Sequence, residues 1–490
     1  MGSLIKNEFI KLTKKKSTLI ILIIFLVYII FSNFMMKYVE SFMNYDYRTN
    51  EEYIEFVKEQ LETINPNEDP YNYIAYKNDL DFYNLYTQYD KDSWQAYIIN
   101  RDFSGYINNV NVYKYGTPAD KQAIEGNPEE EYNIQLQKLS KSDWQGYVKD
   151  EIDILNEQLI AIQGQYDELK AINKNSETQE MQDLSEQIKT LESKRDLLQY
   201  RIDNVIPYGN NFLNDAILTI EVSSNLDYDY NKNDLSYAEK VERQEEITNY
   251  EKAKYALKNK QDVANASNLR GTLMDIYSGY FIFILVFIAM VAGTIVSSEF
   301  EKGTIKMLLV KPYKRWKILL SKYIVSLIMM LFIIVFTVVF HTLIGGIIQG
   351  FSSLSVPVVE YNFTTNSLVT YNLFHYVLII TLSKLPMFIL LTTIAFAVSA
   401  ITTNSAVSII IPIIINTASS IINAIVTPLS IKQAKFLPSL NWDLSQFLFG
   451  KLPQYEFTNF AFALGISVLY WGILVAAAFI AFNKKQIKNI

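Results

Sequence analysis

The sequence predicts an all-α polytopic membrane protein with six transmembrane helices and a mostly helical domain outside the membrane. Two observations lead to this fold class: long stretches of the 490 residues contain no charged side chain, and the charges are segregated along the chain. Residues 37–275 hold 45 of the 51 acidic and 25 of the 44 basic residues, whereas the rest carries a net charge of +13. Because a bilayer accepts long uncharged runs, this segregation indicates a membrane protein.

The first transmembrane helix is expected at residues 18–36, which contain no charged residue. Nineteen helical residues rise about 28 Å, close to the thickness of the hydrocarbon core. A signal peptide is the competing interpretation, but the apolar run is too long and no small-x-small cleavage site follows it. The segment before this helix, residues 1–17, holds five lysines, and such basic flanks stay in the cytoplasm. They are Lys6, Lys11, Lys14, Lys15 and Lys16.

Five more spans are expected in the 276–490 transmembrane domain: about 276–298, 318–345, 373–400, 406–426 and 458–482. With six spans, the basic clusters at the N-terminus, in the loop 299–317 and at 484–488 all fall on one side. We therefore expect a multi-pass protein of the cell membrane with both termini cytoplasmic and residues 37–275 extracellular. Prolines interrupt the segment 427–457, which favours short interfacial or re-entrant helices.

The extracellular domain is predicted to contain an antiparallel, coiled-coil-like helical hairpin. Two runs of apolar residues with spacings of three and four are separated by the polar segment 173–180. Packing inside a helical domain and a protruding partner-binding arm both explain this pattern. The seam residues are Ile152, Leu155, Leu159, Ile162, Tyr166 and Leu169 in the first run, and Met181, Leu184, Ile188, Leu191, Leu198 and Ile202 in the second.

Two further helices are expected to start at Trp94 and Trp144. Each tryptophan begins a similar four-residue sequence and follows a cluster of Asp, Ser and Lys residues, which supplies a possible N-cap. Residues 236–260 form a charged helix that leads back toward the membrane.

The composition argues against an enzyme. The chain has no cysteine and only two histidines, His341 and His375, so a disulfide framework, a thiolate metal site and a histidine zinc site are not expected. It also lacks the phosphate-binding loop G-x-x-x-x-G-K-[ST], a G-x-S-x-G elbow, an H-E-x-x-H motif and an EF-hand loop. We therefore expect no catalytic residue, metal or cofactor in this chain, and no nucleic-acid partner.

The loop 299–317 contains the most informative motif. Its sequence begins Glu-Phe-Glu-Lys-Gly-Thr-Ile at Glu299, continues through paired leucines to Pro312, and ends in a basic turn that contains Arg315. A short helix stopped by Pro312 fits this order. The simplest interpretation of its basic residues is an anchor that keeps the loop in the cytoplasm.

This motif resembles the loop of type-two ATP-binding-cassette (ABC) exporter permeases, the membrane-spanning subunits of such exporters, of a Gram-positive-like type. The resemblance covers residues 276–490 and the first span, and the segment 436–442 is similar to the family's stretch before the last helix. It implies that the loop is a coupling helix in a groove of a partner ATPase, where the glutamates would meet basic groups or amides and the apolar residues would fill the groove. The matching residues are Glu299, Glu301, Lys302, Gly303, Thr304, Ile305, Leu308, Pro312 and Arg315.

The resemblance implies an ATP-driven exporter subunit for an amphipathic substrate, which would be a peptide, a lipid or a hydrophobic drug. ATP and Mg would bind to a separate cytoplasmic ATPase, and the permease would pair with a second copy or a paralogue among membrane lipids. The chain departs from compact family members through the large insertion between its first two spans. The alternative is a surface receptor or secretion scaffold with a similar membrane half and no ATPase.

Polar residues inside the expected spans are candidates for a transport path or for helix contacts. Lys384 lies in the fourth span, where it either has a function or extends its ammonium toward the outer boundary. Asn416, Ser420 and Asn423 share one face of the fifth span together with Ser419. They either hydrogen-bond neighbouring helices or line a path.

Overall fold

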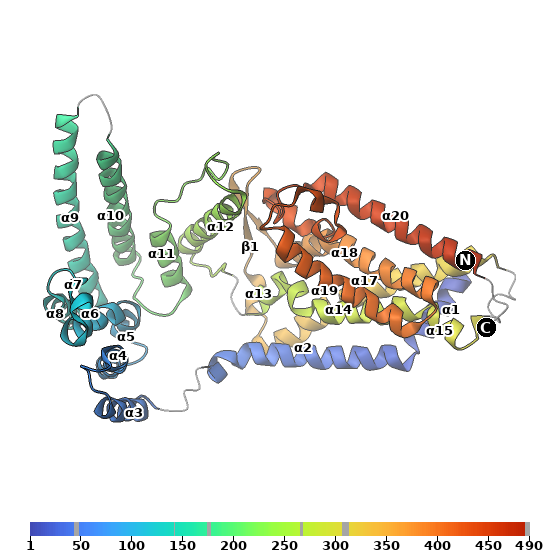
Figure 1. Ribbon diagram of the computed structural model, residues 1–490, viewed down its shortest axis with the longest axis horizontal. Helices are drawn as coiled ribbons and strands as arrows, with labels where there is room; N and C mark the ends of the chain where they lie inside the picture. Colours follow the sequence, from blue (N-terminus) through green and yellow to red (C-terminus); the bar gives the residue numbers. More distant parts are fainter. Residues whose placement is uncertain (44–48, 142, 174–177, 265–267, 306–312, 486–490) are drawn as a thin grey trace. The chain divides into compact units, whose positions relative to one another are not determined.

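The computed structural model describes residues 1–43, 49–141, 143–173, 178–264, 268–305 and 313–485. Figure 1 shows an almost entirely helical chain. Six described helices are long and apolar enough to cross a membrane, which confirms the predicted fold class. These spans are Lys16–Tyr38 within α2 (Lys16–Met43), α14 (Ile276–Thr294), α17 (Arg315–Gln349), α18 (Leu373–Thr402), α19 (Ser405–Val426) and α20 (Phe460–Lys484).

The bounds of the candidate spans differ from the predicted ones by more than two residues in the second and third spans. The second span was predicted to run to residue 298, but α14 ends at Thr294 and a separate helix, α15, covers Ser297–Glu301. The third span is longer than predicted, because α17 already begins at Arg315 and continues to Gln349. Gly350 ends it with a φ of +95°, a conformation that glycine adopts at little cost.

The chain divides into two compact units, whose boundaries differ from those of the predicted 37–275 domain. The membrane unit comprises Met1–Glu40, Tyr228–Lys252 and Val263–Ile490, and the second unit comprises Ser41–Asp227 and Ala253–Asp262. Most of the predicted return helix, α12 (Tyr237–Asn259), therefore belongs to the membrane unit.

Polar contacts explain why this part of α12 belongs to the membrane unit. The Tyr237 hydroxyl donates to the Pro453 carbonyl at 2.5 Å, and the Gln244 side chain accepts from the Leu452 amide at 2.8 Å. Lys252 pairs with Glu360 at 3.0 Å. Sequence periodicity could not predict these contacts, because the partners lie more than 100 residues away in the chain.

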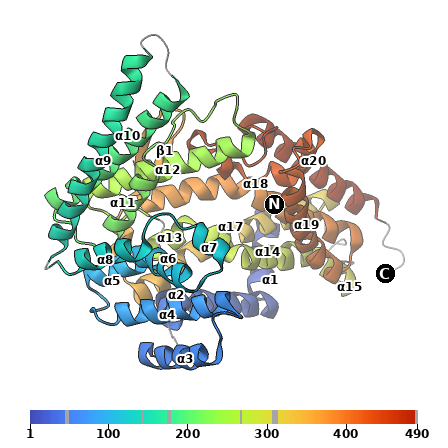
Figure 2. The same cartoon turned by 60° about the vertical axis from the view of Figure 1, so that its left-hand side comes forward.

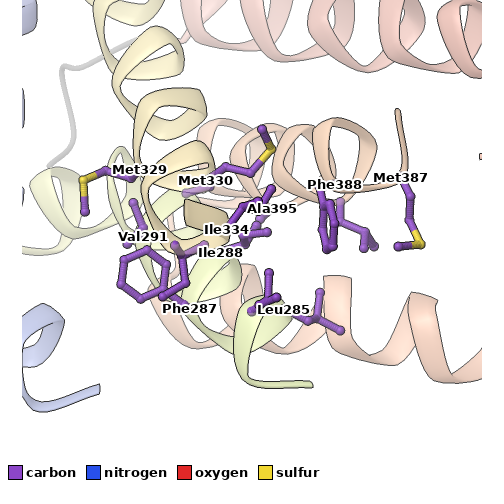
Figure 3. Packing of buried hydrophobic residues seen from close by; sticks show 14 of the residues in the cluster. Leu285, Phe287, Ile288, Val291, Met329, Met330, Ile334, Met387, Phe388 and Ala395 are labelled. Carbon is purple, nitrogen blue, oxygen red and sulfur yellow. The ribbon is translucent and has the colours of Figure 1, made fainter. Parts of the chain in front are cut away.

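The core of the membrane unit lies between α14, α17 and α18 (Figure 3). In a bilayer, close packing rather than exclusion of water holds such apolar faces together. Gly293 of α14 shows how close the packing is, since a Cβ there would lie 2.7 Å from the Ser408 carbonyl oxygen in α19. The core residues labelled in Figure 3 are Leu285, Phe287, Ile288, Val291, Met329, Met330, Ile334, Met387, Phe388 and Ala395.

Short elements complete the membrane unit. Strands β1 (Val358–Asn362) and β2 (Ser367–Tyr371) pair antiparallel, with Val358 opposite Tyr371, and were not predicted. Short helical segments occur in 427–457, as predicted, although their position relative to a membrane stays a prediction. The remaining elements are α1 (Gly2–Thr13), α13 (Leu269–Met274) and the 3₁₀ segments η2 (Ser352–Ser355), η3 (Lys432–Phe436), η4 (Pro438–Leu440) and η5 (Leu444–Gly450).

The second unit is helical where it is described, and its longest helices are α9 (Trp144–Ile172) and α10 (Gln179–Asp203), which lie side by side in Figures 1 and 2. None of the twelve predicted seam residues is exposed, which confirms the hairpin. The other helices are α3 (Asn50–Thr63), α4 (Pro70–Tyr86), α5 (Trp94–Ile98), the π-helix η1 (Ile99–Phe103), α6 (Ser104–Tyr115), α7 (Pro118–Gln122), α8 (Pro128–Leu139) and α11 (Phe212–Val222).

The predicted helix starts at Trp94 and Trp144 are confirmed. Ser93 caps α5 by accepting from the Ala96 amide, and Asp143 caps α9 by accepting from the Gly146 amide. Both caps satisfy amides that have no partner within the first helical turn.

Candidate functional site

A cluster of buried charges lies where α1, α15 and the beginning of α17 meet. Lys322 of α17 is 0% exposed, and its Nζ lies 2.8 Å from Glu8 Oε2 and 2.9 Å from Glu299 Oε1. The same Nζ donates to the Ile295 carbonyl at 3.2 Å. Lys11 pairs with Glu299 as well. The two lysines and two glutamates balance in charge, and we call them the charge cluster.

Local sequence brings these four residues together. Glu8 and Lys11 are three residues apart and therefore lie on one face of α1. Lys322 comes two turns after the start of α17, about 10 Å along the helix axis. Glu299 lies in the one-turn helix α15, which follows directly after α14. The cluster thus ties the N-terminal helix, the predicted coupling loop and the third span to one another.

Glu299 is the centre of this cluster and is only 2% exposed. Its Oε1 contacts both lysines, whereas its Oε2 is buried and has no hydrogen-bond partner among the described residues. Burial lowers the pKa of Lys11, but the hydrogen bond and the charge of Glu299 outweigh this effect, so the pKa is raised overall. Lys11 therefore keeps its positive charge.

A cavity of about 450 Å³ adjoins the charge cluster. Lys15, which lies in its lining, donates to the Thr294 hydroxyl at 2.9 Å. Burial, together with the nearby charges of Lys302 and Lys11, lowers the pKa of Lys15. The cavity lining is formed by Glu8, Lys11, Leu12, Lys15, Thr294, Ile295, Ser298, Glu299, Lys302 and Thr304.

Glu301 connects the beginning of the loop to α19. Its carboxylate accepts from the Ser405 amide and from the Ser405 hydroxyl, both at 2.7 Å. These bonds lower the pKa of Glu301, the amide bond contributing most. Next to them, the Ser297 amide donates to the Ser399 hydroxyl of α18 at 2.9 Å. α15 is therefore fixed to the junction of α18 and α19.

The structure changes the expected roles of Glu299 and Ile305. Both were expected to contact a partner, but Ile305 is 0% exposed and packs in the core of this chain, and Glu299 is paired within the chain. Gly303 has a φ of +67°, which suits glycine after the end of α15. Thr304 donates to the Glu299 carbonyl at 3.4 Å. Leu308 and Pro312 lie outside the described residues.

The exposed loop residues among those predicted are Glu301, Lys302 and Arg315. Arg315 donates to the Lys485 carbonyl at 3.2 Å, so the end of the loop contacts the end of α20. Lys485 in turn donates to the Ile401 carbonyl in α18 at 2.9 Å. Both ends of the loop therefore have contacts with transmembrane helices.

The polar residues predicted within the spans do not form one group. Lys384 pairs with Asp443 at 2.6 Å, a partner that sequence reasoning had missed. Asn423 accepts from the Ser439 hydroxyl at 2.8 Å, which is a contact with η4. Ser420 donates to the Asn416 carbonyl of its own helix at 3.2 Å and has no hydrogen bond to another helix among the described residues.

Sequence reasoning also missed Glu8 and Lys322, although each carried a signal. Lys322 lies inside the predicted span 318–345, where a charge suggests a function by default. Glu8 is the one acidic residue among the lysines of the N-terminal segment. Among the described residues, no group of three or more His, Asp and Glu side chains could hold a metal ion.

Six apolar helices that enclose polar contacts define a multi-pass membrane protein. A family model described as "Protein of unknown function (DUF2705)" matches residues 242–488, half of the chain, and the chain belongs to this family. The match includes the loop 299–317 and five of the six candidate spans.

Two relatives come from Bacillus subtilis (strain 168). The uncharacterized protein YhcI is 28% identical over 204 residues, which cover 42% of this chain and 64% of the relative. The uncharacterized membrane protein YdbK is 25% identical over 198 residues, which cover 40% of this chain and 75% of the relative. The chain thus spans slightly less than two thirds of YhcI. No solved structure matches.

Proposed function

We propose that this chain is the membrane-spanning permease subunit of an ATP-driven exporter whose ATPase is a separate chain, and that the loop 299–317 is its coupling element. The substrate would be an amphipathic peptide, lipid or drug. The observation that carries the proposal is the set of contacts at both ends of the loop. Through α15, the charge cluster and Arg315, the loop contacts α1 and the helices α17, α18, α19 and α20.

Such anchoring suits the transmission of movement. A partner that displaces α15 by a few ångströms would separate Glu299 from Lys322 and Glu301 from Ser405. Leaving a buried charge without its partner costs about 3–5 kcal/mol, so α1 and α17 would move with α15 rather than lose the contact. A partner that binds one position of α15 more tightly would therefore shift the equilibrium between two arrangements of the spans.

The proposed orientation places both termini and the loop 299–317 in the cytoplasm and the second unit outside. It rests on the basic residues that flank the spans. The chain has no cysteine, so the labelling of a single introduced cysteine shows on which side of the membrane that position lies. A cysteine replacing Lys314 should resist an impermeant thiol reagent in intact cells, and one replacing Ile160, which is 75% exposed, should react. Labelling at position 314 from outside contradicts the orientation.

The functional test begins with the wild-type protein. Purification in mild detergent from its native host should recover an ATPase, and hydrolysis should respond to amphipathic substrates after reconstitution. If no ATPase co-purifies, the proposal fails and the receptor or scaffold alternative takes its place.

Coupling through the loop is tested with Glu301→Ala, Ser405→Ala and the double variant. If their contact transmits the signal, each single substitution and the double one should reduce substrate-stimulated hydrolysis to a similar extent. The charge reversal Glu301→Lys should reduce it further. Ile305→Ala is unsuited to this test, because Ile305 lies in the core of the chain.

Glu456→Ala is the control, because it removes an exposed carboxylate outside the loop. All variants should be recovered from the membrane in similar amounts. Full substrate-stimulated hydrolysis in the Glu301→Ala/Ser405→Ala double variant contradicts a coupling role of this contact.

A further inference from the structure

The second unit contains a cavity of about 570 Å³ whose lining combines arginines with tyrosines. Pockets for small molecules are commonly about 300–1,000 Å³ in volume. The lining residues on which the proposal rests come from four helical elements, η1, α6, α9 and α10, and from the loop before α11. They are Arg101, Gly105, Tyr147, Arg201 and Tyr208.

Arg201 of α10 is a buried cation that forms no ion pair with a described residue. It is 2% exposed, and its Nη1 donates to two neutral oxygens, the Ile206 carbonyl at 3.1 Å and Asn214 Oδ1 at 2.6 Å. Its Nε is buried without a hydrogen-bond partner among the described residues, and no described carboxylate forms an ion pair with it. Burying an unpaired donor of this kind costs free energy, which an anionic ligand would recover.

The other charged groups around this cavity are paired. Arg101 donates to both carboxylate oxygens of Asp102 at 2.7 Å. Lys194 pairs with Glu221 at 3.4 Å, and Glu151 pairs with Lys138 at 2.5 Å. Among the charged residues of the lining, Arg201 is therefore the one that forms no ion pair with a described residue.

Tyrosine rings surround this charge. The Arg201 guanidinium lies 4.0 Å from the centroid of the Tyr208 ring, and the Arg101 guanidinium lies 5.3 Å from the same centroid. The Tyr147 ring lies edge-on to Tyr208, with centroids 5.9 Å apart. These rings offer an apolar surface beside a site for negative charge.

We propose that this cavity binds a small organic anion, a carboxylate or phosphate group attached to a ring. The anion accepts hydrogen bonds from Arg201, since planar guanidinium groups recognise both oxyanions. The ring packs against the tyrosines. This proposal stands on the second unit alone and does not depend on the exporter proposal.

The experiment is isothermal titration calorimetry with the full-length protein in detergent. N-acetyl-L-phenylalanine supplies a carboxylate, phenyl phosphate supplies a phosphate, and N-acetyl-L-phenylalaninamide is the neutral control. At least one anion should bind, and the amide should bind at least about tenfold more weakly, because a charged hydrogen bond is lost. The stronger of the two anions identifies the ligand class.

Gly105 offers a matched pair of variants that leave Arg201 intact. It lies in the cavity lining, and a Cβ built on it meets no atom within 4 Å. Gly105→Ala should therefore bind as the wild type does, whereas Gly105→Trp should fill the cavity and abolish binding. Arg201→Gln should weaken anion binding at least about tenfold, while Arg201→Lys should retain part of it.

Because Arg201 also holds the 204–214 segment, the thermal unfolding of each variant is measured alongside. Binding of neither anion to the wild type overturns the proposal, and so does equal binding of the amide. Unchanged binding by Gly105→Trp overturns the location, whatever the stability of the Arg201 variants.

Discussion

Lys322 in the membrane unit and Arg201 in the second unit are both buried cations, with exposed fractions of 0% and 2%. Lys322 contacts the carboxylates of Glu8 and Glu299 and also donates to the Ile295 carbonyl. Arg201 donates to two neutral oxygens, lies over the Tyr208 ring and forms no ion pair with a described residue. The two regions therefore treat a buried positive charge in opposite ways.

This difference indicates two kinds of role. A balanced cluster lowers the cost of burying each charge and fixes the helices that carry the partners, as suits a mechanical connection. A buried cation without a counter-charge keeps part of its desolvation cost, as suits a site that awaits an anion. The predictions below remove, introduce or weaken charges to test this distinction.

The largest effect is expected for Lys322→Met. The substitution leaves Glu8 and Glu299 facing each other without their shared cation, which should cost about 3–5 kcal/mol of unfolding free energy. Thermal unfolding in detergent measures the loss. Adding Glu299→Gln should restore part of it, since one buried negative charge is then removed.

Lys317→Met serves as the control, because Lys317 lies in the same helix but is exposed. Its unfolding temperature should stay close to that of the wild type. Equal losses in the two lysine variants would show that the charge cluster does not hold the helices together.

The next effect is expected in the hairpin of the second unit. Leu159→Asp introduces an unbalanced charge at a seam residue that is 8% exposed, and should cost about 3 kcal/mol. Ile160→Asp is the matched control, because the neighbouring Ile160 is 75% exposed and should tolerate the charge. Thermal melting followed by circular dichroism measures both. Similar melting of the two variants would rule out a packed seam at Leu159.

A smaller effect is expected for Lys384→Met. Lys384 and Asp443 form a charge-balanced pair that is partly accessible to solvent, with side chains 20% and 31% exposed. The substitution should therefore lower the free energy of unfolding by about 1–2 kcal/mol. Combining it with Asp443→Asn should recover part of this loss in thermal unfolding. If Lys384→Met has no effect on stability or transport, the pair is dispensable for both.

The smallest effect concerns the pH dependence of Glu301. Hydrogen bonds from Ser405 hold its pKa below the usual value of 4.5, so this carboxylate contributes stability above that pH. The contribution is lost as the pH falls through the lower, folded-state pKa. Unfolding temperatures measured from about pH 6 down to about pH 3.5 should fall more steeply for the wild type than for Glu301→Gln. Parallel curves would contradict this assignment.

Periodicity predicted much of the helical structure because it depends on local spacing. The seam from Ile152 to Ile202 and the caps of α5 and α9 were all visible as patterns of neighbouring residues. The candidate site was predicted less well. Its loop was found through a motif, but Glu8 and Lys322 lie more than 300 residues apart, and no local pattern joins them.

The sequence by itself determined the number of apolar helices and the helical hairpin, since uncharged runs and heptads follow from bilayer thickness and helix geometry. Only the tertiary structure decided which charges meet. It placed Glu299 and Ile305 inside the chain instead of on a partner-facing surface, and it left Arg201 without an ion pair among the described residues. The physical reason is that burial and pairing depend on contacts between distant segments, which local sequence does not encode.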